Sequence, residues 1–340
     1  MKNGKFITMA IETSCDETSV AFLEEGRTIL SNVISSQIEI HQAYGGVVPE
    51  IASRHHLTNM GHVINRAIEE AGISLKEVDL FGVTYGPGLI GALLIGVATA
   101  KALAFSVGKP LVGVHHIQGH ISSNYIENKE LEPPFLAMVV SGGHTHIIDV
   151  KGYNEFVVLG QTRDDAAGEA FDKVARVLGL GYPGGPLIDR AARQGNPDAI
   201  KFKRVYLDKD SLDFSFSGTK TEVLNYINNQ KQKGQQIIIE DVAAGFQDAV
   251  TDVITDKAIK AALKTGRKSI ALAGGVAANS LLRMKMEKAC GDNGIAFFSP
   301  SNILCTDNAA MIGCAAYYKY KEGFEDNIYL EAYATLSLEI

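Results

Sequence analysis

Short apolar runs separated by polar turns open the chain. Residues 5–36 contain three such runs, divided by the polar stretch "ETSCDET" and the turn "EEGR". The runs are bounded by turn-forming residues, so they predict three consecutive strands. The pattern returns at 135–162, where "SGGH" and "KGYN" separate three further runs. Each segment is therefore expected to fold as a meander.

A second pattern follows each predicted meander. Residues 80–114 and 269–300 each predict a strand, a glycine-rich turn, a long helix and another strand. The repeat of a meander and a βαβ unit indicates an internal duplication. We expect an α/β protein of two related lobes that carry mixed sheets and face a cleft. The first lobe should take in 1–115 and 311–340, and the second should take in 116–310 with a helical insertion.

The composition fits this organisation. The chain has 340 residues, of which 46% are hydrophobic and 21% are charged, so a soluble protein of two lobes is expected. The apolar segment 88–105 is interrupted by Thr99 and Lys101 and predicts a buried helix, not a membrane span. The N-terminus lacks the apolar run of a signal peptide, which favours a cytoplasmic location. The net charge of −7 argues weakly against a general coat for nucleic acid.

The loop between the first two predicted strands of each lobe is a candidate nucleotide site. Both loops are rich in small polar residues, whose backbone N–H groups can bind phosphate. Asp16 and Glu17 in the first loop repel bare phosphate, so they favour a site that also holds a metal ion or a cationic group. Ordinary hairpin loops remain the alternative interpretation.

Three histidines fall within the stretch "HHIQGH" at 115–120. His116 and His120 are four residues apart, so a helix places both on one face, where they can share a metal ion. Asp307, at a predicted junction between loop and helix, is the candidate for a third ligand. A solvated helix face and a plain helix cap are the competing interpretations. Ile117 stands where an HExxH peptidase needs its catalytic glutamate, so a peptidase would keep the metal and lack the base.

Two glycine-rich turns favour different ligands. The stretch "GPGLIG" at 86–91 matches the dinucleotide motif, but the next predicted strand does not end in the required acidic residue. Residues near two other glycine-rich turns, "GLGYPGGP" and "AGGVAANS", are candidates for binding hydroxyls such as those of a ribose. A solvated helix face is the alternative. These residues are Asp172, Gly185, Asp189 and Asn279.

Nine motifs between Ile11 and Gly313 resemble, in order, those of the tRNA threonylcarbamoyladenosine transferase family (TsaD), formerly described as O-sialoglycoprotein endopeptidases. They are "IETSCDET", "YGGVVPEIASRHH", "GPGLIGALLIG", "HHIQGH", "VSGGHT", "DDAAGEAFDKVARVLGLGYPGGP", "FSFSGTKT", "AGGVAANSLLR" and "CTDNAAMIG". The resemblance implies an actin/Hsp70-like ASKHA fold. It also implies transfer of a threonylcarbamoyl group from threonylcarbamoyl-AMP to the N6 amine of adenosine 37, beside the anticodon, in tRNAs that read codons starting with A.

The resemblance implies the site as well. One iron or zinc ion is expected on His116, His120 and Asp307. The adenylate contacts are expected at Val139, Val140, Ser141, Gly142, Gly143, Asp172, Gly185, Asp189 and Asn279. Asp16 or Glu17 is our hypothesis for the group that takes the proton from the amine. The implied partners are tRNA, an ASKHA-fold paralogue of the TsaB type and an ATPase of the TsaE type.

Three other functions remain as alternatives. An ATP-dependent ASKHA phosphotransferase would use magnesium and no transition metal. A metal-dependent peptidase is disfavoured by Ile117, and a non-catalytic scaffold is disfavoured by the complete set of expected metal ligands. The basic stretches 201–204 and 264–268 are candidate contacts for tRNA phosphates.

Overall fold

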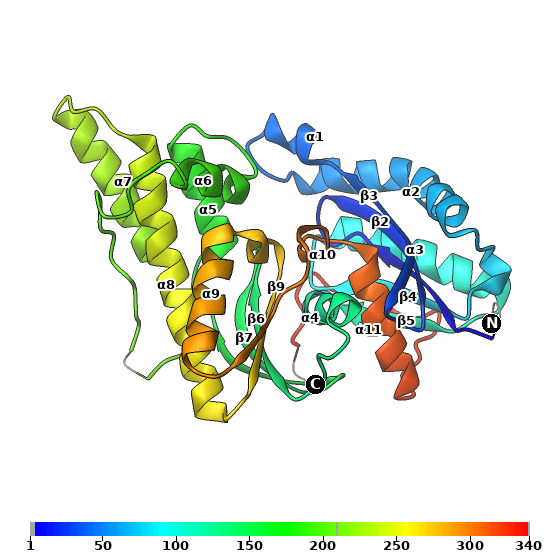
Figure 1. Cartoon of the computed structure of the whole chain (residues 1–340). Helices are drawn as coiled ribbons and strands as arrows, with labels where there is room; N and C mark the ends of the chain where they lie inside the picture. The colour runs from blue at the N-terminus through cyan, green and yellow to red at the C-terminus, as the bar shows by residue number, and fades with distance from the viewer. Residues whose placement is uncertain (1–3, 209, 339–340) are drawn as a thin grey trace. The chain divides into compact units, whose positions relative to one another are not determined.

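Two five-stranded sheets of the same strand order form the framework of the chain (Figure 1). The computed structural model describes residues 4–208 and 210–338. They divide into two compact units. Unit 1 is Met1–Pro133, Lys151–Phe156 and Pro300–Ile340, and unit 2 is Pro134–Val150 and Val157–Ser299.

The sheet of unit 1 has the order β3-β2-β1-β4-β5. The predicted meander is β1 (Ile7–Glu12), β2 (Glu17–Glu24) and β3 (Thr28–Ser36), paired antiparallel. Strands β4 (Leu80–Gly86) and β5 (Leu111–His115) then add in parallel beside β1. The predicted combination of antiparallel and parallel strands is confirmed in this sheet.

The sheet of unit 2 repeats this order as β8-β7-β6-β9-β10. Strands β6 (Phe135–Val140) and β7 (Thr145–Gly152) are antiparallel, and β8 (Glu155–Gln161) follows β7. Strand β9 (Ser269–Ala273) pairs in parallel with both β6 and β10 (Ala296–Phe298). The internal duplication predicted from the repeated pattern is therefore confirmed.

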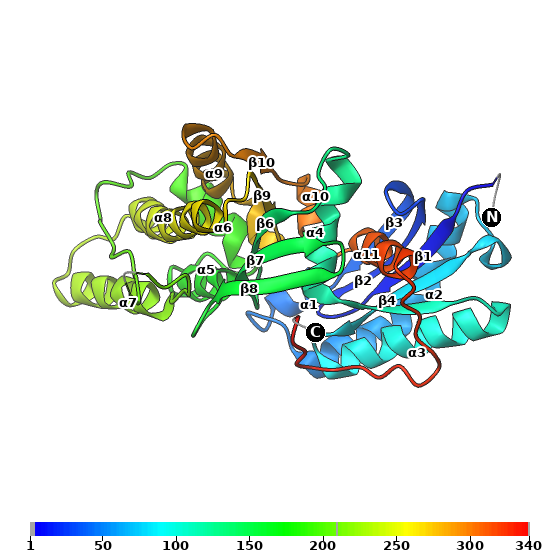
Figure 2. The same ribbon diagram turned by 90° about the horizontal axis from the view of Figure 1, so that it is seen from below.

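Helices cover both faces of the first sheet (Figure 2). Alternate β1 residues, including Met9 and Ile11, pack in one apolar core with α2 (Pro49–Ala71) and α3 (Ile90–Val107). The opposite face packs against α11 (Ala309–Lys321). The helix lies so close that a Cβ on Gly82 would stand 2.7 Å from the Cβ of Ala316. Small residues on this face therefore set the position of α11.

Unit 1 has four further helices in its described residues, besides α2, α3 and α11. They are α1 (Ile38–Gln42), the 3₁₀ helix Leu75–Glu77, α4 (His116–Glu127) and α10 (Asn302–Cys305). Among the described residues, α3 alone is long and apolar enough to cross a membrane. Its residues Val97, Ala100 and Ala104 belong to the core of unit 1. One face of α3 therefore belongs to the core, but Leu94 and Phe105 on this helix are exposed, so the predicted buried helix is buried only in part.

Helices of unit 2 lie mainly between β8 and β9 in the chain. They are α5 (Ala167–Val177), α6 (Gly184–Ala192), α7 (Ser217–Gln232) and α8 (Ile239–Thr265), and the 3₁₀ helix Gly275–Ala278 and α9 (Ser280–Asp292) follow β9. Helix α5 begins at Ala167, after the acidic pair Asp164 and Asp165, so Asp164 is not its N-cap. Asp164 instead accepts hydrogen bonds from the backbone N–H groups of Phe216 and Ser217, at the start of α7.

The bounds of the two units differ from the expected lobes. Helix α4 and the segment 300–310, both expected in the second lobe, belong to unit 1. The physical reason is the extensive packing of α4 against α11, a contact between distant parts of the chain. Strand patterns do not reveal such a contact.

Candidate metal centre and nucleotide-binding loops

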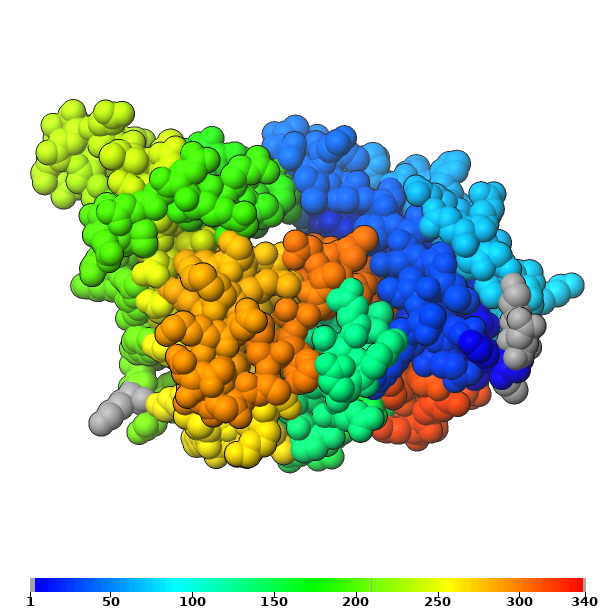
Figure 3. Space-filling view, viewed as in Figure 1, coloured from blue at the N-terminus to red at the C-terminus, as the bar shows by residue number. Residues whose placement is uncertain are grey.

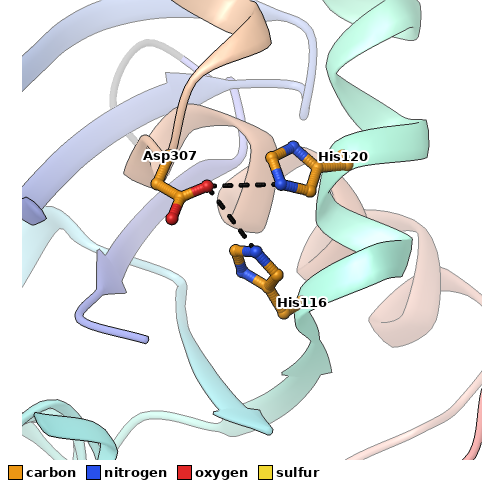
Figure 4. A group of neighbouring side chains, drawn as sticks. All are labelled: His116, His120 and Asp307. Atoms are coloured by element: carbon orange, nitrogen blue, oxygen red, sulfur yellow. Dashed lines mark ion pairs between the residues drawn. The ribbon is translucent and has the colours of Figure 1, made fainter. Parts of the chain in front are cut away.

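Two histidines and an aspartate converge within unit 1 (Figure 4). His116 and His120 lie on the first turns of α4, and Asp307 precedes α11. Asp307 Oδ1 is 3.2 Å from His120 Nε2 and 3.6 Å from His116 Nε2. One ligand atom from each residue lies within 4.8 Å of the other two. The structure thus brings together the three predicted metal ligands.

Local packing explains why these residues meet. Strand β5 ends at His115 and α4 begins at the next residue, so His116 and His120 project one turn apart from the same helix. A Cβ on Gly119, between them, would stand 2.6 Å from Ile312 Cδ1 of α11, so glycine permits the close approach. The segment after α4 and the segment around α10 also lie side by side on the surface (Figure 3).

The alternative reading of Asp307 as a helix cap is wrong. Asn308 occupies the N-cap of α11, and its side chain accepts a hydrogen bond from the backbone N–H of Met311 at 3.1 Å. Asp307 stands one residue earlier, beside the two histidines. Its carboxylate therefore belongs to the histidine cluster, not to the helix end.

The donor set fits a divalent transition metal. Imidazole nitrogen and carboxylate oxygen are the usual ligands of Zn²⁺ and Fe²⁺. His120 is 1% exposed, and neither of its ring nitrogens makes a hydrogen bond with the described residues, although Asp307 lies nearby. Buried polar atoms are nearly always paired. A cation held between His120 and Asp307 would satisfy both groups.

A buried carboxylate faces His116 Nδ1, the ring nitrogen that does not face Asp307. Glu12, at the end of β1, is 0% exposed, and its Oε2 lies 3.4 Å from His116 Nδ1. Ser14 Oγ lies 3.1 Å from the same nitrogen. Burial lowers the pKa of His116, but the carboxylates of Asp307 and Glu12 outweigh it and raise that pKa to about 9. The electrostatics of the cluster thus favour positive charge.

Glu12 was not among the site residues expected from the sequence. The residue completes the run "ITMAIE", whose other members are buried in β1. An ionisable residue almost never lies fully buried without a partner. An acid at the end of an otherwise buried strand was therefore the available signal.

Two further acidic residues, at the end of the β1–β2 loop and the start of β2, add negative charge near Asp307. Asp16 is 5% exposed, and its Oδ2 has no hydrogen-bond partner among the described residues. Burial raises the pKa of Glu17 well above its ordinary value, and the charges of Asp16 and Asp307 raise it further. The roles of Asp16 and Glu17 as proton acceptors stay predictions.

The β6–β7 loop of unit 2 contains the predicted phosphate-binding residues. Val139 and Val140 end β6, and the turn is closed by a hydrogen bond from Ser141 N to His144 O at 2.8 Å. No atom lies within 4 Å of a Cβ placed on Gly142 or Gly143. Within the described part of the chain, the backbone N–H groups of these glycines make no hydrogen bond. They are therefore available to a ligand.

The other predicted adenylate residues lie on α5, α6 and the start of α9. Asp172 accepts a hydrogen bond from Gly184 N at 2.7 Å, which fixes the start of α6, the helix that also carries Gly185. Asp189 accepts a hydrogen bond from Ser280 Oγ at 2.7 Å. Asn279 precedes Ser280 at the N-cap of α9. Asp189 and Asn279 are thus brought close together within unit 2.

A cavity of about 390 Å³ adjoins this pair of residues. Its lining includes Ser280, Gln247 and Arg193. Gln247 accepts a hydrogen bond from Asn279 Nδ2 at 2.8 Å, and Arg193 pairs with Asp189 at 2.8 Å. The volume lies in the range of small-ligand pockets.

The arginines of both basic stretches are already paired. Arg204 makes ion pairs with Asp248 and Asp252. Arg267 makes two hydrogen bonds with Asp149, at 2.6 and 3.0 Å. Because these guanidinium groups are held by carboxylates, the structure gives little support to the prediction that they contact tRNA phosphates.

The duplicated sheets, together with the histidine–aspartate cluster, define an ASKHA-fold protein with a candidate metal centre. Solved structures share the fold. HypF of T. kodakarensis matches with a TM-score of 0.64 and 16% identity, over 94% of this chain and 48% of that one. The activator of 2-hydroxyisocaproyl-CoA dehydratase from Clostridium difficile, with bound ADPNP, matches with a TM-score of 0.53 and 14% identity. The match covers 94% of this chain and 96% of that chain.

Sequence comparison identifies the family within this class. Residues 28–314 match TsaD, described as tRNA N6-adenosine threonylcarbamoyltransferase. The protein of that name from Clostridioides difficile (strain 630) is 55% identical over 332 residues, which cover 98% of each chain. Its counterpart from Clostridium botulinum (strain 657 / Type Ba4) is 56% identical over 330 residues, 97% of each chain. The chain belongs to this family, and the resemblance stated from its motifs is confirmed.

Proposed function

We propose that this protein transfers the threonylcarbamoyl group of threonylcarbamoyl-AMP to N6 of adenosine 37 in tRNAs that read codons starting with A. The amine attacks the carbonyl carbon of the carbamoyl group, and the bond from that carbon to the phosphate oxygen breaks. AMP leaves, and the attacking nitrogen loses a proton. The observation that carries this proposal is the identity of more than half of the residues over nearly the whole chain, accompanied by the cluster of His116, His120 and Asp307.

The cluster would hold one Fe²⁺ or Zn²⁺ ion. When bound, the ion supplies a Lewis acid and a template for orienting the donor. The protein must keep His116 Nε2 and His120 Nε2 deprotonated and directed toward Asp307. Glu12 serves this purpose because its carboxylate can accept a hydrogen bond from His116 Nδ1–H, which keeps the proton on Nδ1 and leaves the lone pair of Nε2 free to bind the metal ion.

Residues of unit 2 would bind the adenylate part of the donor. The backbone N–H groups of Gly142 and Gly143 are suited to its phosphate. Asp189 and Asn279 are suited to ribose hydroxyls, provided that Asp189 shares the oxygens that now pair with Ser280 and Arg193. Such contacts hold the leaving group in place and make attack effectively intramolecular.

Asp16 or Glu17 would accept the proton that N6 loses. The support is their position where the β1–β2 loop meets β2, and the electrostatic influence of Asp307 on Glu17. A carboxylate whose pKa is raised toward neutrality is a stronger base at physiological pH. Glu17 therefore meets this chemical requirement, and Asp16 is the adjacent carboxylate.

We also propose that the protein works with partner proteins of the TsaB and TsaE types. Its proposed location is the cytoplasm, where tRNA is found. A net charge of −7 repels tRNA at long range, so a partner must contribute to tRNA binding. Helices α2 and α3 also expose large apolar side chains, among them Leu57, Leu94 and Phe105. Exposed apolar surface of this kind is typical of a protein interface.

The test is a transfer assay with synthetic threonylcarbamoyl-AMP, labelled in the threonyl group, and unmodified tRNA. We expect label in N6-threonylcarbamoyladenosine at position 37 with the metal-loaded protein and its partners. The His116→Ala variant should transfer none, whereas His62→Ala, which removes an exposed histidine on α2, should match the parent. Transfer of the γ-phosphate of ATP without transfer of label to tRNA would instead establish a phosphotransferase.

A further inference from the structure

The segment after α11 runs along the first sheet toward the start of α4 (Figure 2). Asp326 N donates to Leu111 O at 2.8 Å, and Gly113 N donates to Asp326 Oδ2 at 2.7 Å. Further along, Tyr333 N donates to Tyr85 O at 2.8 Å. The segment 322–338, called here the C-terminal tail, is thus bonded to β5 and then to β4.

The path of the tail is specified by side chains and by glycines. Leu330 packs against the apolar core of unit 1, and its carbonyl accepts a hydrogen bond from Lys101 Nζ at 2.9 Å. A Cβ on Gly86 would stand 2.5 Å from Tyr333 O, so only glycine lets the tail cross at that point. The tail is therefore an integral part of unit 1.

His115 joins the end of this tail to the metal-bearing helix. The ring is 6% exposed and caps α4, because its Nδ1 accepts a hydrogen bond from Ile117 N at 3.1 Å. Its Nε2 lies 3.2 Å from Leu336 O in the tail. A carbonyl only accepts, so Nε2 carries the proton and Nδ1 is left as an acceptor. One tautomer satisfies both contacts.

We propose that His115 is a positioning residue for the metal centre, and that the C-terminal tail acts on the centre through it. The proposal rests on the metal binding given under Proposed function. His116 is the next residue, and His120 lies one turn further along α4, so the capped first turn fixes the approach of both ligands. Loss of a cap loosens the first turn of a helix, and misplaced ligands bind a metal ion less tightly.

The test measures binding of Co²⁺ by its visible absorption, in competition with a chelator. Removing the ring in His115→Ala should weaken Co²⁺ binding about tenfold. His115→Asn keeps a capping oxygen but is too short to reach the tail, so it should give a smaller loss. Leu330→Ala, which loosens the tail away from the site, should weaken binding severalfold. Tyr329→Ala is the matched control. Tyr329 is next to Leu330 in the chain, but its side chain is 81% exposed, so its removal should not change Co²⁺ binding.

A double variant separates positioning from a general loss of stability. If the tail acts through His115, Leu330→Ala should have no further effect on Co²⁺ binding once His115 is alanine. Additive losses would overturn the proposal, as would parent-like binding by His115→Ala. The Leu330→Ala result decides the question even if His115→Ala folds poorly. Failure of the parent to bind Co²⁺ would overturn the metal assignment and this inference together, whereas equal binding by parent and His115→Ala would overturn this inference alone.

Discussion

Replacing Glu12 with glutamine perturbs the metal centre without touching a ligand. The carboxylate of Glu12 accepts hydrogen bonds from Ser14 N and from Thr84 Oγ1, each at 2.5 Å. Its Oε2 also faces His116 Nδ1 at 3.4 Å. Glutamine has the same shape, but it has only one oxygen that can accept. The contacts made by one of the two carboxylate oxygens must therefore change.

The structure indicates that these are the contacts of Oε2, with Thr84 and His116. The Ser14 amide can only donate, so it retains the glutamine oxygen, and the –NH₂ group then faces Thr84 and His116. The Thr84 hydroxyl can rotate and accept, whereas His116 Nδ1–H would meet another donor. The His116 ring avoids this clash by adopting the other tautomer, with its proton on Nε2, which lies 3.6 Å from Asp307 Oδ1. A protonated Nε2 cannot bind a metal ion.

We expect Glu12→Gln to weaken Zn²⁺ or Co²⁺ binding by about 10- to 100-fold, the usual effect of losing such a supporting carboxylate. The unfolding free energy should fall by about 1–3 kcal/mol for the unpaired buried group. Chelator competition and urea unfolding measure the two quantities. Glu24→Gln, at the end of β2, is the control and should change neither.

Parent-like metal affinity in Glu12→Gln would refute this reasoning. A loss of stability without a loss of affinity would show that Glu12 only supports the fold. A loss of affinity that Glu24→Gln shares would point to an effect of net charge.

Three further predictions concern proteolysis, pH and salt. Because Ile117 occupies the position of the peptidase glutamate, the metal-loaded protein should not cleave glycoproteins; a chelator-sensitive cleavage lost in His116→Ala would contradict this. Burial raises the pKa of Asp165, but Lys173 and Lys220 outweigh it and lower that pKa below its ordinary 3.8, so the ionised form stabilises the fold. Asp165→Asn should therefore cost about 1–3 kcal/mol at neutral pH, and urea unfolding should show the difference shrinking as the pH falls below about 3.8; a difference that persists in acid would contradict the ion pairs. The isolated chain should bind tRNA weakly with a shallow salt dependence that steepens when partner proteins are added, and tight, strongly salt-dependent binding by the chain alone would contradict the need for partners.

Periodic features of the fold could be predicted from the sequence. Both meanders and both βαβ units follow from local patterns of apolar residues and turns, and the fold has the expected duplicated order. The shared face of His116 and His120 follows from their spacing in the same way. The pairing of these histidines with Asp307 does not, because it depends on the packing of α4 against α11. The sequence alone made Asp307 a candidate ligand with a helix cap as the alternative, and the resemblance then implied the pairing.

Features that depend on tertiary contacts were missed or misplaced. The role of Asp164 could not be predicted because its partners lie about fifty residues later, at the start of α7. Glu12 was missed because only the folded chain brings β1 beside His116. The contact of Leu336 with His115 likewise joins segments that no local pattern connects.

The most direct test of the account measures transfer activity and metal content on the same samples. The parent, His62→Ala and His120→Ala proteins would be stripped with a chelator and reloaded with graded amounts of Fe²⁺ or Zn²⁺. Threonylcarbamoyl transfer to tRNA would then be measured with partner proteins present. We predict that the rates of the parent and His62→Ala rise in proportion to the bound metal, up to one ion per chain, while His120→Ala neither binds metal nor transfers. Full transfer by the metal-stripped parent, or by His120→Ala, would contradict the central claim.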